Sequence, residues 1–112
     1  MEISEFPKAQ KFKLDEMIDY QSGAVVSKII IKKDTGNLTL FAFDKGQQLS
    51  EHTVPFDAVI QIVEGTAEII IGKKANTVKQ GETIVMPANI AHEVKAIEKF
   101  KMLLTMIKSL HT

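Results

Sequence analysis

Short apolar runs rich in β-branched residues alternate with glycine or proline turns along most of the chain. Residues 24–31, 37–43 and 58–63 are three such runs, and 66–71 follows the last of them directly after Gly65. Runs of this length and composition are typical of β-strands, and a glycine between two of them is typical of a tight hairpin. The spacing therefore predicts a protein built from short, sequentially paired strands.

The second half of the chain continues this pattern. Four further runs follow, at 77–79, 82–86, 92–96 and 100–107. Only residues 11–20 could instead be helical, and their apolar residues do not decide between helix and strand, because short runs are ambiguous. Strands at this spacing favour a β-sandwich or barrel. We therefore predict an all-β fold with its barrel at about 24–108 and an N-terminal arm at 1–22.

Length and composition exclude several classes of protein. A chain of 112 residues can bury one core but not two, so residues 1–112 are expected to form a single domain. The 14 Lys and Arg residues balance the 14 Asp and Glu residues. Without a net positive charge, the chain lacks the main electrostatic attraction to a nucleic-acid backbone. The absence of cysteine excludes disulfides and zinc–thiolate sites. With no apolar run near the ~18 residues of a membrane helix and no leader pattern, we expect a cytoplasmic protein without a membrane partner.

Two groups of residues resemble the two sequence motifs of the cupin family. The first motif reads Gly, five residues, His, one residue, His, three or four residues, Glu, six residues, Gly. The chain has Gly46, His52, Val54, Ala58 and Gly65 at this spacing. Both glycines and the first histidine are thus in register with the motif, and two ligand positions are substituted.

The second motif reads Gly, five residues, Pro, one residue, Gly, two residues, His, three residues, Asn. The chain has Gly81, Pro87, Asn89, His92 and Ala96 at this spacing. Two motifs in the right order resemble the cupin pattern far more specifically than one. The resemblance implies a double-stranded β-helix, or jelly-roll barrel, with a ligand cavity at one mouth.

The resemblance also implies a metal site. Cupin metal ions are held by two histidines and a glutamate of the first motif and by a histidine of the second, a set that suits iron, manganese, nickel or zinc. This chain keeps His52 and His92 but has Val54 and Ala58 at the other two positions. Asp57 is the nearby carboxylate that a bulge could bring into the site as a third ligand. Without it, two imidazoles make a poor site for a divalent ion.

Replacing two polar ligands by valine and alanine leaves apolar surface inside the barrel. Side chains two positions apart on a strand share a face, so alternate residues after Ala58 are expected to point inward with it. A barrel of this size holds one small ligand. We therefore predict an apolar pocket with two histidines as its polar groups, lined by His52, Val54, Ala58, Ile60, Ile62, His92 and Met102.

Two functions follow from these features, and both stay open at this point. The first is a small-molecule-binding protein with a metal-poor site at the barrel mouth, either without catalysis or with weak acid–base activity from its histidines. The alternative is a metal-dependent cupin enzyme of the dioxygenase, isomerase or decarboxylase type that uses His52, His92 and Asp57. Whether the protein is an enzyme, and the identity of its ligand, do not follow from the sequence.

The resemblance further implies a homodimer, because small cupins commonly pair. The arm before Gly23 could add a strand to the sheet of a partner chain and cover its exposed edge. His111 is expected to be a tail residue with no part in the site.

Overall fold

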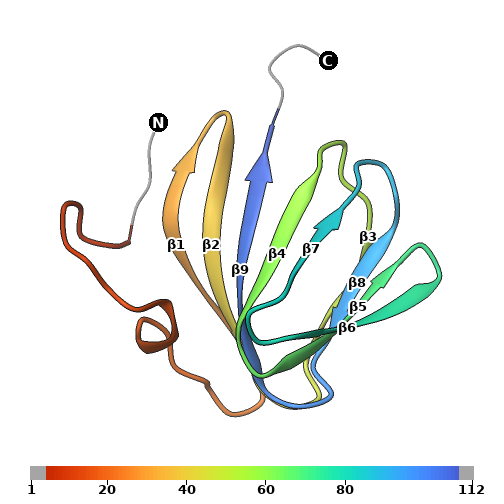
Figure 1. Ribbon diagram of the computed structural model, residues 1–112, viewed down its shortest axis with the longest axis horizontal. Helices are drawn as coiled ribbons and strands as arrows, with labels where there is room; N and C mark the ends of the chain where they lie inside the picture. Colours follow the sequence, from red (N-terminus) through yellow and green to blue (C-terminus); the bar gives the residue numbers. More distant parts are fainter. Residues whose placement is uncertain (1–4, 109–112) are drawn as a thin grey trace.

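The computed structural model describes residues 5–108, which form nine β-strands in two sheets and one short 3₁₀ helix (Figure 1). The all-β prediction is confirmed. His111 lies outside the described residues. The elements are η1 (Leu14–Glu16), β1 (Val25–Lys33), β2 (Gly36–Phe43), β3 (Gln48–His52), β4 (Ala58–Glu64), β5 (Thr66–Ile71), β6 (Lys74–Lys79), β7 (Thr83–Met86), β8 (His92–Lys95) and β9 (Phe100–Ile107).

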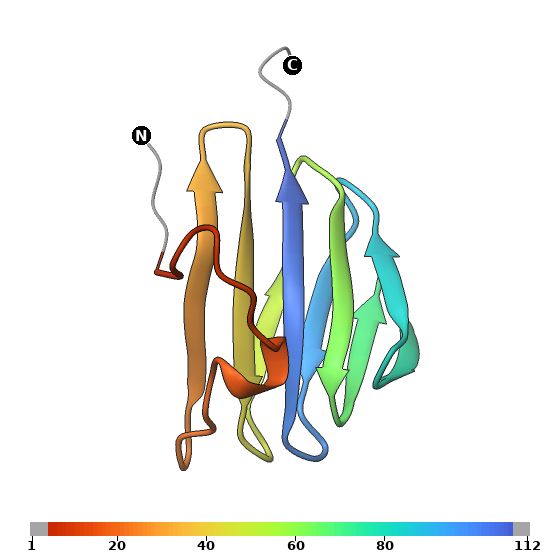
Figure 2. The same ribbon diagram turned by 60° about the vertical axis from the view of Figure 1, so that its left-hand side comes forward.

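The strands form two facing sheets. The larger sheet has the order β1-β2-β9-β4-β7 and the smaller one has the order β3-β8-β5-β6. All strand pairs are antiparallel. Because β9 lies between β2 and β4, and β8 lies between β3 and β5, segments distant in the sequence become neighbours (Figure 2). The topology thereby places β3, which carries part of the first motif, beside β8, which carries part of the second.

The predicted strand positions agree with the structure within two residues in most cases. One strand, β3, was missed. Its sequence, QLSEH, contains a single apolar residue, Leu49, so it carries no strand signal of its own. Pairing with β8 makes it a strand, with Leu49 opposite Val94. Within the ambiguous segment 11–20, only Leu14–Glu16 form a helical turn.

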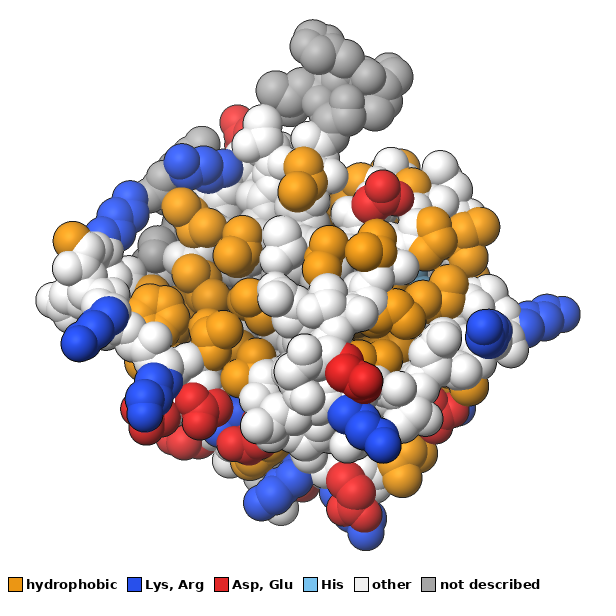
Figure 3. Space-filling model, viewed as in Figure 1, with side chains coloured by type: hydrophobic (Ala, Val, Ile, Leu, Met, Phe, Trp, Pro, Cys, Tyr) orange, Lys and Arg blue, Asp and Glu red, His pale blue; other side chains and the backbone are white. Residues whose placement is uncertain are grey.

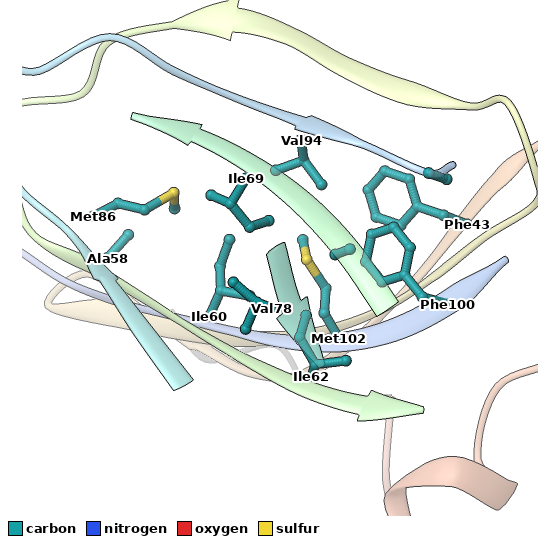
Figure 4. Packing of buried hydrophobic residues seen from close by; sticks show 12 residues of the cluster. Phe43, Ala58, Ile60, Ile62, Ile69, Val78, Met86, Val94, Phe100 and Met102 are labelled. Atoms are coloured by element: carbon teal, nitrogen blue, oxygen red, sulfur yellow. The ribbon is translucent and has the colours of Figure 1, made fainter. Parts of the chain in front are cut away.

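The space between the sheets is filled by apolar side chains (Figure 4). Phe43 and Phe100 are fully buried, and their rings stack with centroids 4.6 Å apart. Ile60 and Met102 are also fully buried. These residues come from alternate positions of their strands, as expected for a sheet with one face turned to the core. The interior of the barrel is therefore a packed core for most of its length.

The N-terminal arm packs on the outer face of the larger sheet of the same chain (Figure 2). Phe6 and Ile18 are buried there against Leu40 and Ala42 of β2. The arm thus provides the apolar cover that this part of the sheet needs. The strand addition to a partner chain concerns a second copy and stays a prediction.

A buried lysine fixes the arm to the sheet. Lys101 on β9 is 6% exposed, and its Nζ donates a hydrogen bond of 2.6 Å to the carbonyl oxygen of Asp15. The same Nζ lies 3.6 Å from Oε2 of Glu64, which also accepts a hydrogen bond of 2.5 Å from the hydroxyl of Tyr20. Burial, followed by this hydrogen bond and the charge of Glu64, raises the pKa of Tyr20 well above its usual range. The hydroxyl therefore stays protonated and remains a donor.

We expect Lys101→Met to lower the free energy of unfolding by about 1–3 kcal/mol, because it removes the buried donor that bonds the Asp15 carbonyl and pairs with Glu64. Lys99 is the matched control. The Nζ atoms of Lys99 and Lys101 both lie over the ring of Tyr20, at 4.9 and 5.0 Å from its centroid, but the side chain of Lys99 is exposed. Lys99→Met should change stability by less than about 1 kcal/mol. Urea unfolding of the two variants measures both values. Equal losses would show that contact with the ring, and not the buried hydrogen bond, holds the arm.

Among residues 5–108, no helix has the length and apolar character needed to cross a membrane.

Candidate functional site

The two motif histidines lie directly opposite each other in the smaller sheet. His52 ends β3 and His92 begins β8, and the register of these antiparallel strands pairs the two residues. Residues paired in this way project side chains on the same face of a sheet. Strand pairing therefore brings together two imidazoles that are 40 positions apart in the chain.

The imidazole rings meet through their Nε2 atoms. His52 Nε2 and His92 Nε2 are 3.1 Å apart, and the rings are nearly perpendicular, at 69°. His52 Nδ1 lies 2.8 Å from the carbonyl oxygen of Ser50, and His92 Nδ1 lies 3.4 Å from that of Ile90. A carbonyl oxygen only accepts, so the short contact places the proton of His52 on Nδ1. The Nε2 lone pair of His52 then faces His92, and a proton or a cation between the rings completes the contact.

The two histidines differ in their surroundings. His92 is 3% exposed, whereas His52 is exposed at the mouth of the barrel. Burial lowers the pKa of His92, the nearby His52 lowers it further, and the carbonyl of Ile90 opposes part of this shift. His92 is consequently neutral at neutral pH and can offer a lone pair.

This shift predicts a pH-dependent stability. The unfolded-state pKa of histidine is about 6.5, and the folded-state pKa of His92 lies below it. Between these two values the unfolded state binds more protons, so the free energy of unfolding should fall as the pH falls through this window. The dependence should be weaker in His92→Asn, which retains His52 and all carboxylates. Urea unfolding at about pH 7.5, 6.5 and 5.5 measures it; native stability that rises toward pH 5.5 would contradict the prediction.

A small cavity lies behind the histidine pair, between the two sheets. Its volume is about 20 Å³, which is enough for about one water molecule. Its lining residues are Leu49, His52, Ile60, Met86, His92, Val94, Met102 and Leu104. The mouth of the barrel thus has a polar entrance and a narrow, mostly apolar interior.

The structure brings together four of the seven residues predicted to line the pocket: His52, Ile60, His92 and Met102. Val54 lies in the loop between β3 and β4, where its carbonyl accepts a hydrogen bond from the backbone of Asn89. Ala58 and Ile62 are buried in the core but do not line the cavity. Met86 also lines the cavity but was not among the residues predicted to do so, because a methionine is most simply read as a core residue.

Asp57 is not beside the histidines. Its Oδ1 accepts a hydrogen bond of 2.8 Å from the backbone of Ala88, and its side chain is exposed. It lines a groove on the outer side of the barrel together with Phe56 and Val59. Within residues 5–108, no cluster of three or more His, Cys, Asp or Glu side chains is arranged to hold a metal ion. The carboxylate fixes the loop after β7 and does not extend the histidine pair.

Two antiparallel sheets with a histidine pair at one mouth define a cupin-type domain. The family described as a cupin domain matches residues 39–108, and the chain belongs to the cupin family.

Solved structures support this assignment. A conserved protein of unknown function from Streptococcus pyogenes is similar over 96% of this chain and 94% of its own, with 34% identity and a TM-score of 0.91. A cupin 2 conserved barrel domain protein from Leptotrichia buccalis shares 40% identity over 87% of this chain and 47% of its own, with a TM-score of 0.84. A cupin superfamily protein from Desulfitobacterium hafniense has 23% identity over 92% of this chain and 94% of its own, and its TM-score of 0.87 shows the same fold. No curated protein matches the sequence significantly.

The residues present do not fit the four-ligand divalent centre that the family implies. The donors at the mouth are two imidazoles, and the positions of the missing ligands hold Val54 and Ala58. Iron and manganese prefer sites that include carboxylate oxygens, and none lines the cavity. The chemistry of this site therefore depends on the histidine pair and on the apolar side chains behind it.

Proposed function

We propose that this cupin binds a small ligand at the His52–His92 pair and does not act as a four-ligand metal enzyme. The observation that carries the proposal is the Nε2–Nε2 contact of 3.1 Å at the entrance of a cavity without a carboxylate. The pair is the polar centre of an otherwise apolar site. With the His52 proton on Nδ1, its Nε2 can accept a hydrogen bond from a ligand hydroxyl that takes the place of the contact with His92.

The size of the cavity limits what enters beyond the pair. About 20 Å³ accepts one hydroxyl or carbonyl oxygen, so the body of an organic ligand would rest at the mouth. The partner of His52 Nδ1 is the carbonyl of Ser50 and not a carboxylate, which gives the imidazole less help as a general base. Binding without catalysis, or with weak acid–base activity, is therefore the function that we favour.

The proposal is tested by NMR titration with phenol, cyclohexanol and cyclohexanone, observed at the imidazole resonances. At least one probe should shift both His52 and His92, and His92→Asn should abolish the shift. Asp57→Asn should leave it unchanged, because that carboxylate is bonded to Ala88. Shifts confined to other parts of the protein, or none at all, would overturn the proposal.

The alternative is a metal-dependent cupin enzyme that uses His52 and His92. The favouring observation is their spacing, because two nitrogens at about 2.0–2.1 Å from one ion are 3.1 Å apart at an angle of roughly 95–100°. Titration with Fe(II), Mn(II), Ni(II) and Zn(II) tests it. We expect weak binding of all four; tight, stoichiometric Fe(II) or Mn(II), lost in Asp57→Asn, would establish the alternative instead.

We further propose that the chain forms a homodimer through the uncovered part of the larger sheet. The arm leaves a groove of about 410 Å³ open beside Val59 and Ile107, and Ile107 is 70% exposed. Figure 3 shows hydrophobic side chains gathered in two areas of one face, with most of the charged side chains around its margin. Light scattering of native protein and Ile107→Lys measures the oligomeric state. A native monomer would overturn this proposal.

A further inference from the structure

We infer that the cavity behind the histidine pair is a site for a soft monovalent metal ion, Cu(I), completed by the thioethers of Met86 and Met102. The inference goes beyond the proposed small-ligand function and does not depend on it. It concerns an ion inside the cavity, whereas the body of an organic ligand would rest at the mouth.

Four side chains with nitrogen or sulfur lone pairs line this one small space. They are the imidazoles of His52 and His92 and the thioethers of Met86 and Met102. Met86 is 3% exposed at the end of β7, and Met102 is fully buried on β9. Figure 4 shows both thioether groups directed into the space between the sheets. A volume of about 20 Å³ suits a single ion better than an organic molecule.

The chemistry of these donors selects the metal. Thioether sulfur is a soft ligand that favours Cu(I), and imidazole also binds copper well. Imidazole and thioether are uncharged ligands, so an ion with one charge costs less to bury among them than an ion with two. Hard divalent ions such as Mn(II) find no oxygen ligand in the lining. A donor set that is poor for the usual cupin metals is therefore well suited to Cu(I).

The histidines are already oriented for such an ion. Each Nδ1 faces the carbonyl oxygen of the residue two positions earlier, Ser50 for His52 and Ile90 for His92. A backbone carbonyl that accepts from one ring nitrogen is the usual way in which a protein directs the other nitrogen toward a metal. The two Nε2 atoms are 3.1 Å apart, so one cation between the rings can take both nitrogens as ligands.

The competing explanation is that both methionines only fill the core, which is a common role for this residue. It predicts that leucine, which has a similar volume, replaces either methionine without consequence. Met106 provides the matched control. It lies on β9 with Met102 and packs against the same core, yet it does not line the cavity. The two explanations therefore differ in which Met→Leu substitution affects binding.

The experiment is an anaerobic titration of the full chain with Cu(I) in competition with bicinchoninate. The native protein should bind one equivalent. Met86→Leu and Met102→Leu should each lower the affinity at least tenfold, and Met106→Leu should leave it within about twofold of native. Zn(II), which needs only the imidazoles, should bind all three variants as it binds the native protein. Native-like Cu(I) affinity in both cavity variants would overturn the inference.

X-ray absorption of the native Cu(I) complex provides a test that requires no variant. Sulfur neighbours around the metal are expected, and a first shell of nitrogen or oxygen alone would overturn the inference even if a variant failed to fold. The two proposals fail separately. If phenol shifts the imidazole resonances but Cu(I) does not bind, only the metal site is refuted. If Cu(I) binds but no organic probe shifts these resonances, only the small-ligand function is refuted.

Discussion

Replacing Gly65 by alanine is expected to lower the free energy of unfolding by about 2–4 kcal/mol, a large part of the stability of a domain this size. Gly65 turns the chain between β4 and β5 with a φ of +79°, a conformation that costs about 1–2 kcal/mol with a side chain. A Cβ there would also lie 2.6 Å from the carbonyl oxygen of Lys99 and 3.0 Å from Cβ of Phe100. Backbone atoms cannot move away cheaply, so the β4–β5 turn or β9 must shift.

Gly46 and Gly81 separate the two causes. Their φ values are +85° and +86°, close to that of Gly65, but nothing lies within 4 Å of a Cβ at either position. Gly46→Ala and Gly81→Ala should therefore show only the conformational cost of about 1–2 kcal/mol. Chemical denaturation of the three variants measures the difference. Equal losses of stability at all three positions would show that the close approach of β9 to the turn adds nothing to the cost of a side chain at position 65.

The sequence predicted the fold well because its signals are local or regularly spaced. Glycine and proline turns mark the strand ends, and two spaced motifs identify the family. The strand β3 was missed because its conformation depends on its partner: Leu49 faces Val94 of β8, and the segment has no other apolar residue. The packing of the arm on the sheet of its own chain was not predicted either. It depends in part on Lys101, which is buried in the structure but looks like a surface residue in the sequence.

The candidate site could be predicted only in part. The histidine pair follows from strand register, which the motif spacing indicates, and the structure has the two Nε2 atoms 3.1 Å apart. Parity along β4 indicates which side chains point inward but not which of them reach a cavity, so Ala58 and Ile62 were included although they do not line it. Met86, on β7, was missed because a methionine is most simply read as a core residue. Asp57 points away because a backbone N–H of the neighbouring loop binds its carboxylate, and no sequence pattern marks that contact.

Restoring the missing carboxylate should convert the site into a divalent metal centre. Ala58 is 1% exposed and lies opposite Met86, one of the residues that line the cavity. Without metal, Ala58→Glu should lose about 2–4 kcal/mol of stability, because it buries a carboxylate without a partner. Zn(II) should then bind to this glutamate and the histidines and stabilise the variant by about 2.7 kcal/mol at a hundredfold excess over the dissociation constant. Native protein should gain much less at the same Zn(II) concentration.

Two controls isolate the carboxylate in this prediction. Ala58→Gln has nearly the same shape as Ala58→Glu but no charge, so it should be destabilised and gain little from Zn(II). Ala67→Glu also buries a carboxylate, at a position on β5 that is 1% exposed and does not line the cavity, and Zn(II) should not restore its stability. Thermal unfolding with and without Zn(II) measures all four proteins. Equal stabilisation of Ala58→Glu and Ala67→Glu would mean that the metal binds elsewhere and that position 58 does not face the histidine pair.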